Sequence, residues 1–119
     1  ECVLAVERIC GAVPDLVGTV GTIEALPGAV NVIPGRARFT IDVRSPHDEV
    51  RRRAVGELLA AFASICEQRH LSLSHHVMLE SRVAQCAPWL MAQLEAAVAA
   101  EGVAVRRLPS GAGHDGLAM

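Results

Sequence analysis

The stretch SGAGHD at residues 110–115 gathers three side chains that can do chemistry in one glycine-rich segment. Serine, histidine and aspartate are used as nucleophiles and as general acids or bases. The stretch lacks the Gly-x-Ser-x-Gly pattern that exposes a nucleophilic serine, and its two glycines alone are a weak phosphate-loop signal. By residue type, a ligand-binding loop and a connecting loop are equally good interpretations.

Arg44 is a second candidate, because it ends an alternating segment directly before a helix-start signal. A guanidinium in that place can bind a carboxylate through two parallel hydrogen bonds. The alternative is an ordinary surface arginine that pairs with Asp42 or Asp48. Asn31, which precedes the letters VIPG, is by type more often a turn residue than a ligand.

The histidines and cysteines form no metal-binding pattern. None of the five histidines belongs to an H-x-x-x-H or H-E-x-x-H arrangement, and His75 and His76 would face opposite sides of a strand. The four cysteines have no C-x-x-C spacing, so we expect buried, reduced thiols. The chain alone is therefore predicted to bind no metal.

Length and charge narrow the class of protein. The chain has 119 residues and a net charge of -2, which argues against nucleic acid or an anionic membrane as the main partner. It shows no signal peptide and no long apolar run, which predicts a cytoplasmic protein without membrane association. It begins with Glu1 inside a helical pattern, so we expect a piece of a longer protein.

Hydrophobic periodicity predicts three helices and four strands, in the order helix, strand, strand, helix, strand, helix and strand. Ser45 and Pro46 are typical of a helix start, and Gly102 is typical of a helix end. The expected helices cover about residues 2–13, 46–69 and 88–101, and the expected strands cover 17–26, 37–45, 71–79 and 103–108.

This order of elements predicts an α+β fold, with an antiparallel sheet layered against two helices. Residues 1–82 are expected to form that domain. Residues 83–119 are expected to have a different order of elements, in which a helix and a strand lead into the glycine-rich loop, as in an α/β domain.

Two motifs taken together resemble the allantoate amidohydrolase and N-carbamoyl-L-amino-acid hydrolase family, amidases of the aminoacylase-like zinc-peptidase superfamily. They are NVIPG followed by DVR, which ends at Arg44, and SGAGHD near residue 110. The resemblance spans essentially the whole chain. It implies that residues 1–82 are most of a ferredoxin-like lid domain that binds substrate and dimerises. Residues 83–119 would be the chain's return to the catalytic domain.

The resemblance also implies roles for individual residues. Arg44 would bind the substrate carboxylate, and Asn31 would form a hydrogen bond near the scissile group. Ser110, Gly113 and His114 would contact the substrate from the catalytic-domain loop. The implied substrate is a small carboxylate, either allantoate or an N-carbamoyl-L-amino acid, and the implied assembly is a homodimer through the lid domain.

The resemblance implies two divalent metal ions, zinc or manganese, in the whole enzyme, where metal-activated water attacks an amide or ureido carbonyl. The family's metal ligands, its general-base glutamate and a lid histidine have no counterpart in this chain. We therefore expect the chain alone to be inactive.

Strand geometry separates Asn31 from Arg44. If residues 37–44 form one straight strand, Arg44 lies ~25 Å from the turn that holds Asn31. A small substrate cannot span that distance, so the two residues of one chain are predicted to serve two different active sites across a two-fold dimer. Two other classes stay open, namely a dimerising α+β module without chemistry and a ferredoxin-like domain that senses a small ligand.

Overall fold

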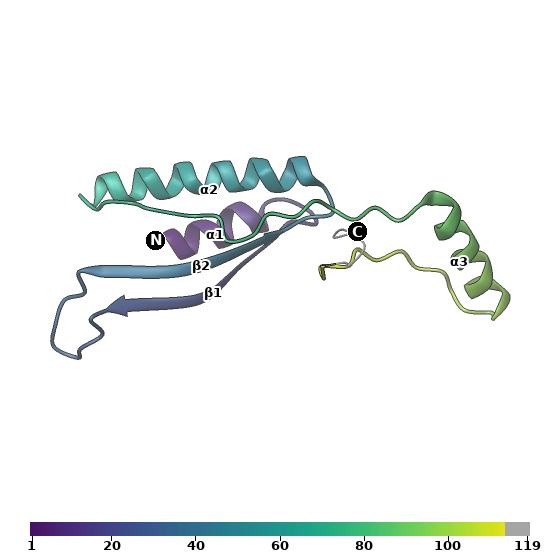
Figure 1. The fold of residues 1–119 in the computed structure, drawn as a ribbon, viewed down its shortest axis with the longest axis horizontal. Helices are drawn as coiled ribbons and strands as arrows, with labels where there is room; N and C mark the ends of the chain where they lie inside the picture. The colour runs from purple at the N-terminus through teal and green to yellow at the C-terminus, as the bar shows by residue number, and fades with distance from the viewer. Residues whose placement is uncertain (114–119) are drawn as a thin grey trace. The chain divides into compact units, whose positions relative to one another are not determined.

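The computed structural model describes residues 1–113, and the predicted substrate contact of His114 lies outside these residues. The chain divides into two compact units, Glu1–Glu80 and the residues from Ser81 onward. The elements follow in the order α1 (Cys2–Gly11), β1 (Val17–Leu26), β2 (Arg36–Arg44), α2 (Asp48–Gln68) and α3 (Pro88–Ala100), of which only α3 belongs to the second unit (Figure 1).

The first unit is built on a hairpin of two antiparallel strands, β1 (Val17–Leu26) and β2 (Arg36–Arg44). Val17 pairs with Arg44 at one end of the hairpin and Leu26 pairs with Arg36 at the other. The alternation in β2 leaves Phe39, Ile41 and Val43 half-buried and the residues between them exposed, as the sequence pattern predicts.

A β-bulge bends the hairpin near its middle. Gly21 and Thr22 of β1 lie opposite the single residue Thr40 of β2. The backbone N–H of Thr22 donates a hydrogen bond to Thr40 Oγ1 at 3.1 Å, so a side chain replaces a ladder bond at this point. A Cβ at Gly21 would meet the same oxygen at 3.1 Å, which favours glycine there.

Two helices, α1 (Cys2–Gly11) and α2 (Asp48–Gln68), pack against each other and against the hairpin. Their apolar stripes meet the inward side chains of the strands, where the Phe39 and Phe62 rings touch edge to face with centroids 5.8 Å apart. This arrangement confirms the α+β class. The buried core consists of Ala5, Val6, Cys10, Leu16, Ala54, Leu58 and Phe62.

The start of α2 differs from the sequence prediction, because Ser45 is not its N-cap. The helix begins at Asp48 with His47 as the N-cap. The Ser45 hydroxyl instead accepts a hydrogen bond from the backbone N–H of His47 at 3.2 Å. This local turn holds the serine oxygen away from the first turn of the helix.

The second unit contains α3 (Pro88–Ala100), which starts at proline and ends before Gly102, as predicted. Gly102 has a φ of 71°, and its N–H donates to the Ala99 carbonyl at 3.0 Å. The N–H of Val103 donates to the Val98 carbonyl at 3.3 Å, which completes a Schellman motif.

The strands predicted over 71–79 and 103–108 are wrong, since neither segment joins a sheet among the described residues. Alternation makes a segment suitable for a strand, but a strand also needs a neighbour that supplies hydrogen bonds. Here the apolar side chains of the first segment are largely exposed, with Val77 at 68% and Leu79 at 83%. In residues 1–113, no helix combines the length and the apolar character that a membrane span requires.

Candidate functional site

Arg44 is the last residue of β2 and lies on the polar face of the hairpin. Its Nε donates to Asp42 Oδ1 at 2.8 Å and its Nη2 donates to Asp42 Oδ2 at 2.7 Å. The two side chains are 56% and 51% exposed, so the pair lies on an open surface and not beneath a helix. The hairpin therefore presents an oriented guanidinium to solvent, beside the loop that leads into α2.

The ion pair keeps both groups charged. Hydrogen bonds from Arg44 lower the pKa of Asp42, although partial burial opposes this effect. The same hydrogen bonds raise the pKa of Arg44. A guanidinium binds carboxylates through a forked pair of hydrogen bonds, so an arriving carboxylate can compete with Asp42 for Arg44.

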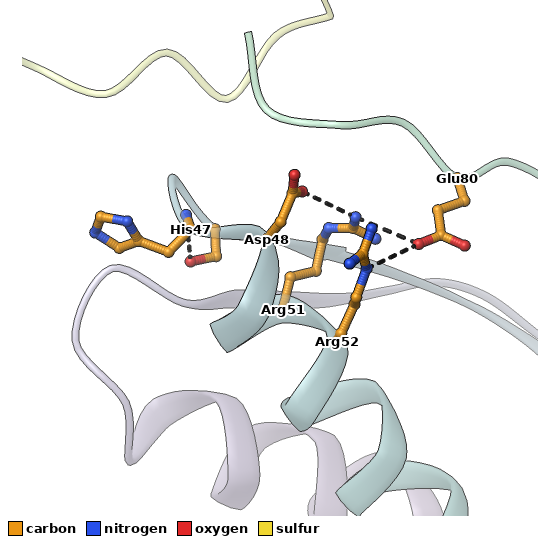
Figure 2. A network of polar contacts seen from close by, with 6 residues as sticks. His47, Asp48, Arg51, Arg52 and Glu80 are labelled. Atoms are coloured by element: carbon orange, nitrogen blue, oxygen red, sulfur yellow. Dashed lines mark hydrogen bonds and ion pairs between the residues drawn. The ribbon is translucent and has the colours of Figure 1, made fainter. Parts of the chain in front are cut away.

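A second polar cluster lies at the start of α2, a few residues after Arg44 (Figure 2). Arg51 Nη2 lies 3.1 Å from Asp48 Oδ1 and 3.5 Å from Glu80 Oε1, and the Arg51 side chain is only 15% exposed. Arg52 Nε lies 3.5 Å from the same Glu80 oxygen. These contacts hold Glu80, the last residue of the first unit, against the first turns of α2.

Sequence reasoning missed the role of Glu80. A single glutamate after an alternating segment carries no motif, and its partners lie about thirty positions earlier in the chain. Glu80 reaches them because the segment after α2 runs back along that helix (Figure 1). Asp42, by contrast, was identified from the sequence as a possible partner of Arg44, two residues away on the same strand face.

Asn31 lies in the exposed loop 27–35 at the end of the hairpin opposite to Arg44. The loop is closed by a hydrogen bond from the Gly35 N–H to the Leu26 carbonyl at 3.0 Å. The nine residues of β2 span ~26 Å at the usual rise per strand residue. The structure therefore separates Asn31 from Arg44 along the strand and does not bring them together.

Ser110 and Gly113 lie in an exposed segment without helix or strand, in the second unit. The Ser110 Oγ accepts a hydrogen bond from the backbone N–H of Ala112 at 3.3 Å, which makes a local turn. Ahead of this segment, Arg107 forms an ion pair with Glu95 of α3, with Nη2 2.9 Å from Oε2. The Arg107 hydrogen bonds lower the pKa of Glu95.

Residues 1–113 do not fit the two-metal centre that the resemblance implies. Nowhere in this range do three His, Cys, Asp or Glu side chains gather closely enough to hold a metal ion. Among the described residues, Arg44 is an exposed cation that Asp42 orients through two hydrogen bonds, as Glu1 orients Arg69 and Glu95 orients Arg107.

Comparison with known proteins tests the resemblance. No family model matches the chain. It is 33% identical over 103 residues to the N-carbamoyl-L-amino acid amidohydrolase of Geobacillus stearothermophilus, which covers 87% of this chain. It is 36% identical over 113 residues to the allantoate deiminase of Arabidopsis thaliana, which covers 88% of this chain. The allantoate amidohydrolase of Escherichia coli is 31% identical and covers 96% of it.

This chain is related to the allantoate and N-carbamoyl-L-amino-acid amidohydrolases. It spans 25%, 22% and 28% of the lengths of these three relatives. The crystal structure of a protein described as an amidohydrolase or peptidase from Burkholderia cenocepacia superposes with a TM-score of 0.86 at 30% identity, and the match covers 96% of this chain and 28% of that one. AtUAH in complex with glyoxylate superposes with a TM-score of 0.81 at 29% identity, over 98% and 28% of the two chains.

Proposed function

We propose that this chain is the substrate-binding and dimer-forming segment of a metal-dependent amidohydrolase. The whole enzyme would cleave the ureido or carbamoyl C–N bond of allantoate or of an N-carbamoyl-L-amino acid. Relatives named for both reactions match along most of the chain, which supports this assignment. The observation that carries it is the exposed, oriented guanidinium of Arg44.

Arg44 would bind the substrate carboxylate. Both proposed substrates carry a carboxylate near the ureido group, and a bidentate pair fixes the orientation of a planar acid as well as its position. Asp42 holds the guanidinium in place through two hydrogen bonds, so little side-chain entropy remains to be lost on binding. The related AtUAH is described with glyoxylate, a small carboxylate, which agrees with this ligand class.

Asn31 would contact the substrate of a second active site. It lies ~26 Å from Arg44 along β2, which is longer than either proposed substrate. A two-fold homodimer resolves this separation, because the Asn31 loop of one protomer can reach the site that contains Arg44 of its partner. Ser110, Gly113 and His114 would complete the substrate contacts in the whole enzyme.

The dimer contact is proposed at the edge of β1 that does not pair with β2. A two-stranded sheet leaves one edge of each strand unpaired, and such an edge can pair with a second copy. Ile23 on β1 is an apolar residue with 64% exposure. We expect a homodimer in sedimentation velocity and a monomer for Ile23→Lys with an unchanged far-UV circular dichroism spectrum. A wild-type chain that stays monomeric at high micromolar concentration would contradict this contact.

Two divalent metal ions, zinc or manganese, belong to this proposal for the whole enzyme. The described residues of this chain would hold the substrate and not the metals. The chain alone should therefore show no hydrolysis when zinc or manganese is added. Cleavage of either substrate by the purified chain would overturn this division of roles.

A segment exchange tests the proposed function. The matching segment of the Escherichia coli allantoate amidohydrolase is replaced by this chain, and loss of allantoate and of N-carbamoyl-L-amino acids is followed by chromatography. We expect cleavage of at least one of the two substrates. A folded, dimeric and metal-loaded chimera that cleaves neither would favour a module without chemistry.

A further inference from the structure

The loop 27–35 at the end of the hairpin exposes two aliphatic side chains (Figure 1). Val30 is 108% exposed and Ile33 is 92% exposed, so folding of a single chain leaves both in contact with solvent. None of the nine residues of the loop is charged. A hydrogen bond from the Val32 N–H to the Ala29 carbonyl at 3.4 Å helps to fix the shape of the loop. Aliphatic groups gathered on an uncharged, ordered surface are typical of a contact site.

An apolar groove lies between α1 and β1 in the same unit. Its volume is about 400 Å³, and its apolar lining consists of Val3, Val6, Cys10, Leu16, Val17 and Val20. Because α1 packs against α2 and β1, and α2 packs against β2, the side of α1 that faces away from α2 lies over the unpaired edge of β1. The groove opens on that side, since Glu7 and Gly11 on its α1 wall are exposed. Val17, at the start of β1, is 58% exposed beside this edge.

We propose that Val30 and Ile33 of one protomer dock into the groove between α1 and β1 of a second copy of this chain. The inference rests on the proposed function, in which two copies pair through the free edge of β1. A two-fold axis perpendicular to the sheet makes the two β1 strands antiparallel. The end of β1 at Leu26, where the loop begins, then lies beside Val17 of the partner subunit, which lines the partner's groove.

Symmetry and charge both favour a second copy as the occupant of the groove. Each copy carries one loop and one groove, so a closed dimer makes the contact twice. The loop is uncharged and the groove has Glu7 as its single charged residue, so docking removes few charged groups from water. The contact also brings Asn31 toward Arg44 of the partner subunit, because Val17 pairs with Arg44. Two strand spacings, or about 10 Å, then separate β1 of one copy from β2 of the other, a distance that a small substrate can span.

Sedimentation velocity of the full chain measures the contribution of the two side chains. The double substitution of Val30→Asp and Ile33→Asp should raise the dissociation constant of the dimer at least about tenfold, because two carboxylates would have to enter an apolar groove. Both positions are exposed in a single copy, so the far-UV circular dichroism spectrum should not change. Val77→Asp is the control, since Val77 is 68% exposed and lies outside both surfaces. The control should change the dissociation constant by less than about twofold. A double variant that dimerises as tightly as the wild type would overturn the docking.

Isotope-filtered NOE spectra locate the contact directly. A mixed dimer contains one copy with carbon-labelled isoleucine methyl groups and one unlabelled copy, and Ile33→Leu identifies the Ile33 signal by its loss. We expect NOEs from the Ile33 methyl group to methyl groups of Val3 and Val17 of the partner subunit. A dimer that shows NOEs between its two β1 strands but none from Ile33 would overturn the docking and leave the proposed β1 contact in place. A wild-type chain that stays monomeric at high micromolar concentration would overturn both.

Discussion

Gly18 marks the point where α1 lies closest to the hairpin, and Gly18→Ala should destabilise the first unit. A Cβ at this position would overlap Cys10 Sγ, and would lie 2.9 Å from Cys10 Cβ and 3.0 Å from Val6 Cγ1. All three atoms belong to buried core side chains of α1, which have little room to move. The methyl group can be accommodated only if α1 moves away from β1.

The expected cost follows from two opposing effects. Overpacking of a close-packed core costs about 1–3 kcal/mol. Replacement of glycine by alanine restricts the unfolded chain and returns about 0.4–1 kcal/mol. The net result is a destabilisation of about 1–2 kcal/mol, or a fall in the unfolding midpoint of roughly 5–15 °C for a unit of this size. Gly18 pairs with Val43, so the disturbance reaches the strand end that holds Arg44.

Urea unfolding followed by far-UV circular dichroism measures this cost. Fluorescence is unsuitable because the single tryptophan, Trp89, lies in α3 of the second unit. Gly56→Ala in α2 is the matched control, since a Cβ there meets nothing within 4 Å. That substitution should stabilise the chain by about 0.5–1 kcal/mol.

A double-mutant cycle with Cys10→Ala identifies the cause. Removal of the Cys10 sulfur should reduce the cost of Gly18→Ala by at least ~0.5 kcal/mol, with some cost remaining from Val6. The reasoning fails if Gly18→Ala costs the same with and without the sulfur. It also fails if Gly18→Ala stabilises the chain as Gly56→Ala does.

Three further predictions concern the charged surface and a helix end. His70 has a φ of 55° after α2, so His70→Gly should raise the free energy of unfolding by roughly 1 kcal/mol in urea titrations, and a decrease would contradict this reading. Because Arg44 lowers the pKa of Asp42, the ion pair should stabilise the fold above about pH 4. This stabilisation should be lost as the pH falls through the lower pKa that Asp42 has in the folded chain. An Asp42 carboxyl pKa at or above ~3.9 in an NMR titration would refute this prediction. Glu80→Gln should speed amide exchange over residues 71–80 and cost about 0.5 kcal/mol, since it weakens the contact with Arg51; unchanged exchange would show that this contact does not hold the segment.

The elements that could be predicted from sequence are those whose signals are local. Strand β1 has the predicted bounds, because a segment rich in β-branched residues is stopped by Pro27 and Gly28, and α2 follows its apolar stripe. The inward and outward faces of β2 also follow from a period of two. Each of these segments finds its partner within the first unit, so local preference and packing agree.

The elements that could not be predicted depend on contacts with other parts of a fold. Residues 71–79 alternate as well as β2 does, yet no described strand pairs with them, and the ion pairs of Glu80 hold the end of the segment at α2. The prediction that Ser45 is the N-cap of α2 was wrong, because its hydroxyl accepts a local hydrogen bond from the His47 N–H. At the candidate site, the type of Arg44 and its possible partner Asp42 were readable from the sequence, but the bidentate geometry was not.

The role of Arg44 in carboxylate binding is tested most directly by substrate kinetics in the segment-exchange enzyme. Arg38 is the matched control, because it is an exposed arginine on the same strand and the same polar face. Arg44→Gln should lower kcat/KM about 10- to 100-fold, mainly through KM, since it removes a charge-assisted pair of hydrogen bonds. Arg38→Gln should leave kcat/KM within about two-fold of the parent. An Arg44→Gln enzyme with unchanged KM would contradict the assignment.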